Sequence, residues 1–297
     1  MLPFSQLLKN ARMTAGLLCA LVSMQASFPG DNLGQIKALR VIGDVTAQSS
    51  DEPAPAPLHN GDLLYETYTI VTAAQASVVL VFSNGSTVRV LGNTRLELSA
   101  FRQDPLDQET VEIQSLKAEP STSLTELNLV YGELVGDVKK LSTSSSYSIH
   151  TPVGASGIRG TVFHDRYRSD GDTATYAFTT TEGLVDFTDL TGLKHSIPAG
   201  QVLSGRHQLK KPAGAATYRQ SKVSARAREV IQAQTEVMRI VRSKVVFHRK
   251  DGHSLKMGKP KLHKEPNGGR DEEDDGIYLK RQKTAQPAPP PANKTRK

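Results

Sequence analysis

The feature that most constrains the fold is a series of β-rich runs separated by turn residues between Gly34 and Leu203. The clearest pair of runs is 76–82 and 87–91, with Asn84-Gly85 between them. Asn-Gly between two such runs is the strongest short-range signal for a β-hairpin, because a type I′ turn needs positive φ at both central positions. The pattern therefore predicts a hairpin with a type I′ turn.

The same pattern of strand-forming runs separated by turn residues recurs along this part of the chain. Asp170-Gly171 separates a run at 161–167 from a run at 174–179, which predicts a second hairpin. A smaller unit, glycine followed by aliphatic residues, recurs with irregular spacing at Gly34, Gly43, Gly61, Gly132, Gly136 and Gly200. Because the spacing varies, a solenoid of fixed period is not indicated. We expect an all-β fold: a compact antiparallel β-sandwich or roll, or a short irregular β-coil.

Two stretches interrupt the β pattern. Residues 51–57 contain three prolines, which lack the donor that a ladder needs, and are expected to form an exposed insertion. Residues 103–123 are polar and contain several acidic residues, and they are expected to form a long loop or a short irregular excursion.

Charge divides the 297 residues sharply. The net charge of +7 is made up of +2 over 1–26, −9 over 27–205 and +14 over 206–297. Such an asymmetry suggests that 206–297 contacts an anionic polymer or a membrane surface. Aromatic residues make up 5% of the chain and tryptophan is absent, so stacking of single-stranded bases is not indicated. Nucleic acid is therefore not an expected partner.

The N-terminus has the features of an export signal. Lys9 and Arg12 precede an apolar run over 13–24, which is shorter than the roughly 20 residues of a membrane span. Small residues follow, which predicts a signal peptide over 1–26 with cleavage between Ala26 and Ser27. The expected location is periplasmic or extracellular. The alternative is an uncut segment that anchors the protein in the membrane.

The C-terminal third changes in character. Apolar residues recur three, four or seven positions apart over 217–248, among them Ile231 and Met238, which predicts a basic amphipathic helix. The helix could pack on the β domain, pair with another helix or lie on an anionic membrane. Residues 249–297 are basic and rich in proline near their end, a composition typical of disorder.

The search for reactive groups is negative. His164-Asp165 are neighbours, but successive residues of a strand face opposite sides. Residues 271–276 resemble the start of a calcium loop, but Gln282 stands where the bidentate glutamate belongs. The sequence therefore predicts no enzyme activity, no metal site and no cofactor.

Residues 151–163, TPVGASGIRGTVF, resemble the characteristic segment of FecR-domain proteins. Further segments resemble the family in the same order, beginning with Asn60-Gly-Asp62, 72–76, Asn84-Gly-Ser86 and Tyr131–Leu134. The resemblance ends with Glu182–Val185 and Ala199–Val202 and covers about 34–204, within a FecR-like β domain over 27–205.

The resemblance implies a noncatalytic, all-β extracytoplasmic domain. Its motif residues here are expected to be structural: Thr151, Pro152, Arg159, Gly160, Thr161 and Phe163. We expect Arg159 to span a turn and pair with backbone carbonyls or a carboxylate. The alternative is that Arg159 binds an anion or a partner.

Two functions are considered. The first is a noncatalytic exported binding or scaffold module of the bacterial envelope. Its FecR-like domain would recognise a protein or glycan partner, and its basic C-terminal region would contact anionic material. The alternative is a membrane-anchored FecR-type regulator acting between an outer-membrane receptor and a sigma factor.

Overall fold

A computed structural model describes residues 34–210 and 216–248, all of which belong to one compact unit. The predicted signal peptide, its cleavage point between Ala26 and Ser27 and the predicted disordered tail at 249–297 lie outside the described residues. These expectations remain predictions.

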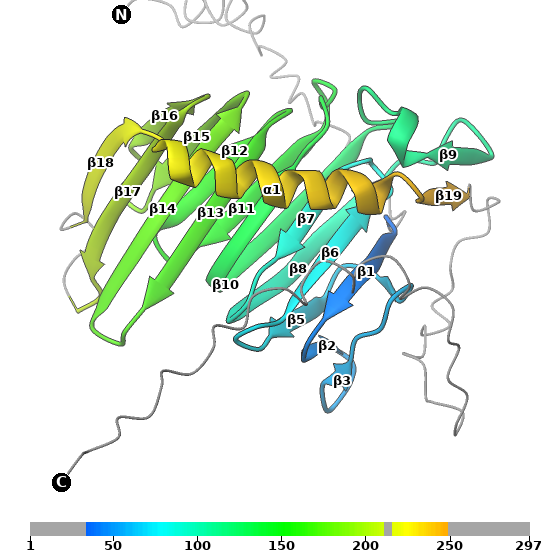
Figure 1. Ribbon diagram of the computed structural model, residues 1–297, viewed down its shortest axis with the longest axis horizontal. Helices are drawn as coiled ribbons and strands as arrows, with labels where there is room; N and C mark the ends of the chain where they lie inside the picture. The colour runs from blue at the N-terminus through cyan, green and yellow to red at the C-terminus, as the bar shows by residue number, and fades with distance from the viewer. Residues whose placement is uncertain (1–33, 211–215, 249–297) are drawn as a thin grey trace, which may run out of the picture. The chain divides into compact units, whose positions relative to one another are not determined.

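The described residues mostly form strands, which are arranged in two sheets that share one strand (Figure 1). We call these sheets ladder A and ladder B. Ladder A has the strand order β3 (Ala56–Pro57), β2 (Val45–Ser49), β5 (Tyr68–Thr72), β8 (Thr94–Gln103), β10 (Ser123–Asp137), β11 (Ser146–Thr151), β12 (Gly154–Ile158), β15 (Leu184–Asp189) and β16 (Lys194–Pro198).

Ladder B is built around the second half of the same long strand. Its order is β4 (Leu63–Leu64), β1 (Ile36–Ile42), β6 (Ser77–Phe82), β7 (Thr87–Val90), β10, β13 (Val162–Ser169), β14 (Thr173–Glu182), β17 (Gln201–Gln208) and β18 (Thr217–Lys222). The prediction of an all-β fold with one helix is confirmed.

Strand β10 connects the ladders. Residues 123–131 pair with β8 in ladder A, and residues 132–137 pair with β13 in ladder B. The chain then returns to ladder A as β11, which runs parallel to the first half of β10. All the other paired strands are antiparallel, so this return is the one departure from the expected antiparallel pairing among the described strands.

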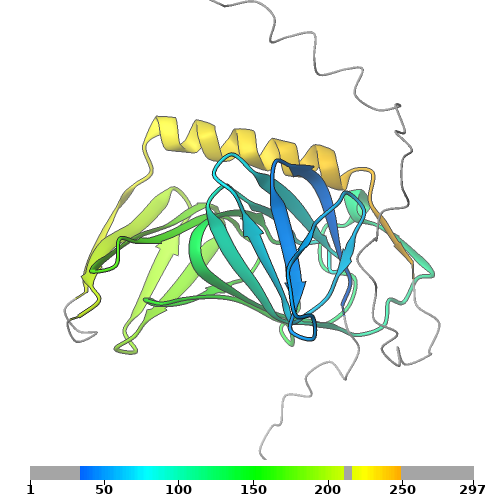
Figure 2. The same cartoon turned by 90° about the horizontal axis from the view of Figure 1, so that it is seen from below.

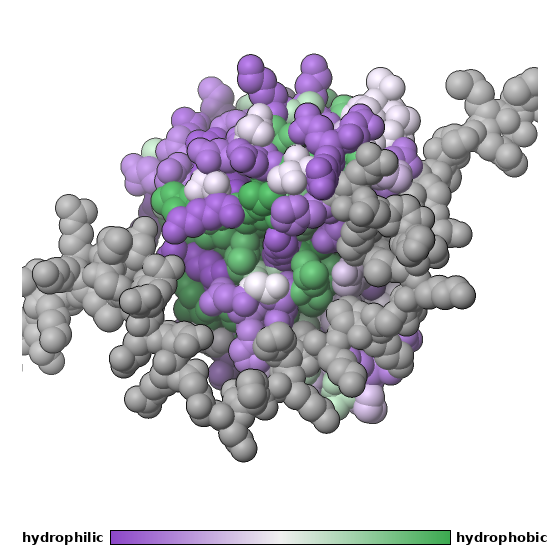
Figure 3. All heavy atoms as spheres, turned by 90° about the vertical axis from the view of Figure 1, so that its right-hand side faces the viewer, coloured by the Kyte–Doolittle hydropathy of each residue, from purple (hydrophilic) through white to green (hydrophobic). Residues whose placement is uncertain are grey.

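The core lies between the two ladders, as the view from below shows (Figure 2). Phe82 of ladder B meets Phe101 of ladder A edge to face, with ring centroids 5.0 Å apart. Phe178 of ladder B stacks on Phe187 of ladder A at 4.5 Å. All four side chains are fully buried. The surface at the β1 end of the molecule exposes apolar residues among hydrophilic ones (Figure 3).

Both predicted hairpins are present, but the first turn is not type I′. Strands β6 and β7 pair around residues 83–86, where Gly85 has a φ of 88° and Asn84 does not have a positive φ. Asn84 is instead fully buried, and its amide nitrogen donates to Ser123 Oγ at 3.1 Å. This contact with β10 fixes Asn84 in an ordinary backbone conformation, so the turn needs only one left-handed residue.

Two expected loops contain short strands. Ala56–Pro57 of the proline-rich insertion forms β3 at the edge of ladder A, where a missing donor is tolerated. The polar stretch at 103–123 contains β9 (Thr110–Glu112) and the 3₁₀ helix η1 (Ile113–Ser115). Strand β9 pairs with β19 (Val246–His248), a distant partner that the local sequence does not reveal.

The helix expected over 217–248 is shorter, because both ends of that range pair as strands. Helix α1 spans Ala225–Arg242, and β18 and β19 flank it. Ser224 is the N-cap, and its side chain accepts a hydrogen bond from the backbone of Ala227 at 3.2 Å. Among the described residues, no helix is both long enough and apolar enough to cross a membrane.

Helix α1 lies across the outer face of ladder B (Figures 1 and 2). Its buried residues are Ile231, Thr235 and Met238, while Val230 is 49% exposed. Ile231 and Met238 pack in a cluster with strand residues Val79, Val81, Val135 and Val162. Of the three interpretations of the helix, the structure therefore shows packing on the β domain.

Candidate functional site

The family motif forms a tight turn followed by a strand junction. Thr151 ends β11, and its hydroxyl donates to the Gly154 carbonyl at 2.9 Å across a turn in which Pro152 is exposed. Gly154 has a φ of 145°, and a Cβ there would lie 2.3 Å from the Thr188 carbonyl oxygen. The glycine thus lets β12 approach β15 closely.

The second half of the motif joins the loop after β10 to both ladders. Thr161 exchanges two backbone hydrogen bonds with Val138, and its hydroxyl donates to the Leu184 carbonyl at 3.0 Å. Phe163 is fully buried against Gly136, where a Cβ would lie 2.1 Å from the phenyl ring. Gly160, before Thr161, has a φ of 73°.

Arg159 lies on the surface of this junction. Its guanidinium donates to the Ser142 carbonyl at 3.3 Å, and the side chain is exposed. The motif residues therefore bind backbone and core, and they do not converge on a common cavity.

The outer face of ladder B is divided in two. One part lies under α1 and is apolar. The other part lies beyond the helix, and cross-strand register puts two rows of mostly polar side chains there, because paired residues share a face. Across β13, β14, β17 and β18 the rows are Arg166, Ala177, Ser204 and Arg219, then Arg168, Thr175, Arg206 and Thr217.

We call Arg166, Arg168, Arg206 and Arg219 with Thr175, Ser204 and Thr217 the arginine face. All four arginines are exposed. Arg166 and Arg168 are two residues apart on one strand, about 7 Å, and Arg206 and Arg219 lie two and three strands away, about 10 and 14 Å. The arginine face is therefore a flat array of guanidinium groups with hydroxyl groups between them.

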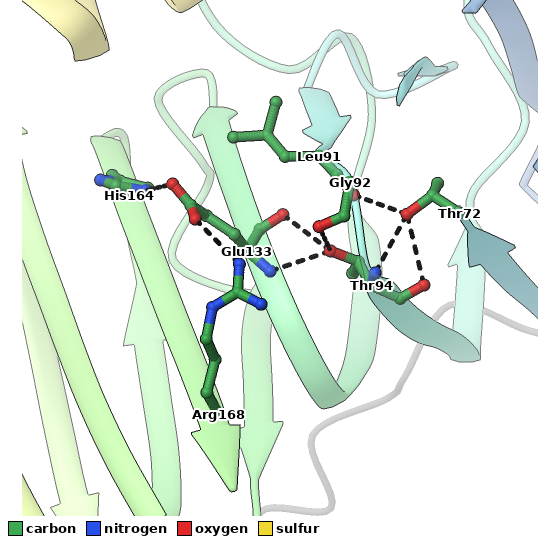
Figure 4. A network of polar contacts seen from close by, with 7 residues as sticks. All are labelled: Thr72, Leu91, Gly92, Thr94, Glu133, His164 and Arg168. Carbon is green, nitrogen blue, oxygen red and sulfur yellow. Dashed lines mark hydrogen bonds and ion pairs between the residues drawn. The ribbon is translucent and has the colours of Figure 1, made fainter. Parts of the chain in front are cut away.

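One carboxylate, Glu133 of β10, borders this face (Figure 4). Its Oε1 lies 2.7 Å from His164 Nε2, and its Oε2 lies 3.4 Å from Arg168 Nη2. The His164 hydrogen bond lowers the pKa of Glu133, burial opposes this, and the charges of His164, Arg166 and Arg168 lower it further. Glu133 thus partners one of the four arginines.

The backbone of Glu133 is held from the other side. Its N–H donates to Thr94 Oγ1 at 2.9 Å, and the Thr94 N–H donates to Thr72 Oγ1 at 3.0 Å. Thr72 in turn donates to the Leu91 carbonyl at 2.6 Å. This chain of contacts, visible in Figure 4, fixes β10 where it passes from ladder A to ladder B.

Arg166, Arg206 and Arg219 make no ion pair with another described residue. Nearby acidic groups are occupied: Asp172 pairs with Lys210 at 2.8 Å, and Asp170 accepts from the Thr173 N–H at 2.8 Å. The arginine face therefore has an excess of positive charge. Guanidinium groups in this arrangement can bind carboxylate or phosphate by charge-assisted hydrogen bonds.

A groove of about 440 Å³ lies between α1 and the ends of β13 and β14. Its charged lining residues are Glu182, Arg228, Glu236 and Arg239. Arg239 lies 3.8 Å from Glu182 and 4.0 Å from Glu236, so these charges largely satisfy one another.

Residues suited to catalysis or metal binding do not gather in the described ranges, where no group of three His, Cys, Asp or Glu side chains could hold a metal ion. His164 and Asp165 point to opposite faces of β13, as strand alternation predicts. Asp165 is fully buried between the ladders with both carboxylate oxygens unpartnered, and burial raises its pKa to about 8.

The arginine face was missed by the sequence analysis. Its four arginines come from three strands between 162 and 222, and Arg219 lies in the range that was expected to be helical. The available signal was the alternation in Arg166-Tyr167-Arg168, which places both guanidinium groups on one side of a strand.

The described residues define an all-β protein whose one helix covers half of a sheet face and leaves the other half cationic. A model of the FecR protein family matches residues 68–186, from the start of β5 into β15. The chain is therefore a FecR-domain protein, as the sequence motifs predicted.

Comparison with solved structures finds two crystal structures described as a "putative anti-sigma factor" from Parabacteroides distasonis ATCC 8503. Each is 9% identical, with a TM-score of 0.38 over 53% of this chain. The match spans 61% of that chain. A search of curated proteins found no match.

Proposed function

We propose that this chain is a noncatalytic FecR-type regulator that passes on a signal by binding a protein partner. The observation that carries the proposal is the FecR match over residues 68–186, since that family is regulatory. The motif residues support it, because they bind backbone carbonyls and core side chains at a strand junction. A protein partner suits this family better than a glycan does.

The proposal includes export, because a FecR domain of this type works outside the cytosol. Its two forms differ in the fate of residues 1–26. An uncut apolar run at 13–24 would anchor the regulator in the membrane, and cleavage before Ser27 would release it. N-terminal sequencing of the protein from envelope fractions separates the forms, since a start near Ser27 contradicts the anchored regulator.

The regulatory role is tested by transcript profiling. Cells lacking the chain should change a defined set of transcripts, and the full chain should restore them. A Gly154→Val chain, whose side chain would collide with the Thr188 carbonyl, should not restore them. Pro152→Ala, at an exposed position of the same turn, is the matched control and should restore them. If no transcripts respond to loss of the chain, the proposal is wrong.

A further inference from the structure

The arginine face is an interaction surface that the motif residues do not explain. It lies on the opposite side of ladder B from the core, and of its four arginines only Arg166 and Arg168 fall inside the range matched by the FecR model. Arg206 and Arg219 lie on β17 and β18, beyond it. The structure therefore joins two arginines from the family domain to two from the strands that follow it.

The geometry favours an extended chain as the occupant. Side chains on one face of an extended segment recur every two residues, about 7 Å apart, which equals the spacing of Arg166 and Arg168 along β13. Thr175 and Thr217 add exposed hydroxyl groups in the same row as Arg206. A segment with acidic residues at alternate positions could therefore pair with successive guanidinium groups.

Other anionic partners fit less well. Tyr176 and Tyr218, the tyrosines of β14 and β18, make ring contacts with each other and with Phe178, Phe187 or His195, so they are not free to stack on bases. The arginine face includes no large apolar side chain that would enter a lipid layer. Carboxylates on a protein segment need neither feature.

We propose that the arginine face binds an acidic, extended segment of the protein partner through paired guanidinium and carboxylate groups. This inference rests on the proposed function, which makes the partner a protein. Glu133 borders the site as a positioning residue, because its contacts with His164 and Arg168 hold β13 and β10 in register at the edge of the face.

The test uses the full chain and a fluorescein-labelled peptide of five Glu-Ser repeats, with five Gln-Ser repeats as the neutral control. Fluorescence anisotropy in low salt should show binding of the acidic peptide only. Arg166→Ser with Arg206→Ser should weaken binding at least tenfold. The matched control, Lys117→Ser with Lys194→Ser, loses the same charge at exposed sites away from the face and should change affinity less than twofold.

Several outcomes would overturn the proposal. Equal weakening by both double variants would show a response to net charge alone. Tighter binding of phosphatidylglycerol vesicles or of single-stranded DNA, lost in the arginine variant, would assign the face to phosphates. Tighter peptide binding after replacing the acidic residues 271–275 by their amides would assign the face to the chain's own segment.

The outcome is separable from that of the regulatory proposal. Peptide binding is measured without cells, so it can succeed where no transcripts respond. Conversely, a transcript response that survives Arg166→Ser with Arg206→Ser would support regulation and contradict a role for this face.

Discussion

The two halves of the outer face of ladder B have the same backbone architecture and opposite chemistry. Under α1 the outward positions are Val79, Val81, Val135 and Val162, packed on Ile231 and Met238. Beyond the helix the same face, on β13, carries Arg166 and Arg168. The chemistry of a strand's outward residues therefore depends on whether another element covers them. Alternation along the strand only determines on which face each residue lies.

Strand β13 contains this comparison within eight residues. Val162 lies under the helix, and Arg166 and Arg168 are exposed, all on one face. The inner face of the strand carries Phe163, Asp165 and Tyr167, all buried.

The largest effect is expected at Asp165. Its raised pKa means that the folded protein holds a proton more tightly than the unfolded chain does. The contribution of the protonated Asp165 to stability is therefore fully present below about pH 4 and is lost as pH rises towards about 8, by up to about 5 kcal/mol. Asp165→Asn should remove this loss, as measured by urea unfolding across pH 4–8.

The control for Asp165 is Asp107→Asn, at an exposed carboxylate, which should retain the pH dependence of the unmodified protein. A difference in stability between the unmodified protein and Asp165→Asn that does not change from pH 4 to pH 8 would show that Asp165 does not take up a proton on folding. The contrast between the inner and outer faces of β13 would then be wrong.

The next largest effect on stability is expected in the half of the outer face of ladder B that α1 covers. Met238 is fully buried against ladder B, so Met238→Ala should lower the free energy of unfolding by about 2–5 kcal/mol. Val230, on the same helix, is 49% exposed, and Val230→Ala should cost less than about 0.5 kcal/mol. Equal effects in chemical denaturation would mean that α1 does not pack as described.

The ion pair between Arg242 of α1 and Asp137 of β10 should contribute less to stability. Arg242 Nη1 of α1 lies 2.7 Å from Asp137 Oδ2 of β10, and each side chain is 12% exposed. Arg242→Met should cost about 3 kcal/mol, because it leaves the Asp137 charge nearly buried without a partner. Adding Asp137→Leu should recover much of the loss. A double variant as unstable as the sum of the single ones would contradict this.

The smallest effect is expected at Glu133, which borders the arginine face. The lowered pKa of Glu133 means that its charge stabilises the folded state above the ordinary carboxyl pKa, and this contribution is lost as pH falls through the lowered value. Glu133→Gln should cost about 1 kcal/mol at pH 7, and its stability should converge with that of the unmodified protein in acid. Glu97→Gln should cost less, because the ion pair of Glu97 with Arg95 is more exposed than the Glu133 site.

Much of the fold was predictable from local pattern. Asn84-Gly85 and Asp170-Gly171 marked the two hairpins, because a turn of a few residues is decided by neighbouring chemistry. The type of the first turn was not predictable, because Asn84 is held by Ser123, which is 39 residues away in sequence. The same limit hid β9, whose partner β19 follows more than 130 residues later.

The end of the helix illustrates a second limit. Val223 and Val245 continue the apolar spacing of α1 and are buried, but they lie outside it. The spacing of apolar residues indicates which residues are buried. It does not show whether a buried residue belongs to the helix or to the segment next to it. Open strand edges at β17 and β9 pair with the flanking residues, and these edges exist only once the sheet has formed.

The candidate site divides in the same way. The motif from Thr151 to Phe163 identified the FecR domain, because its glycines and hydroxyls are consecutive and make local contacts. The arginine face could not be recognised, since Arg166, Arg206 and Arg219 become neighbours only through the register of β13, β14, β17 and β18.

The amino-acid sequence by itself determined the strand content, the two hairpins, the family and the existence of an amphipathic helix, because each depends on residues within a few positions of one another. The tertiary structure decided where β10 changes ladders, how far α1 extends and which half of a sheet face it covers. Those outcomes depend on backbone pairing between distant segments, and that pairing also determines which arginines remain exposed together.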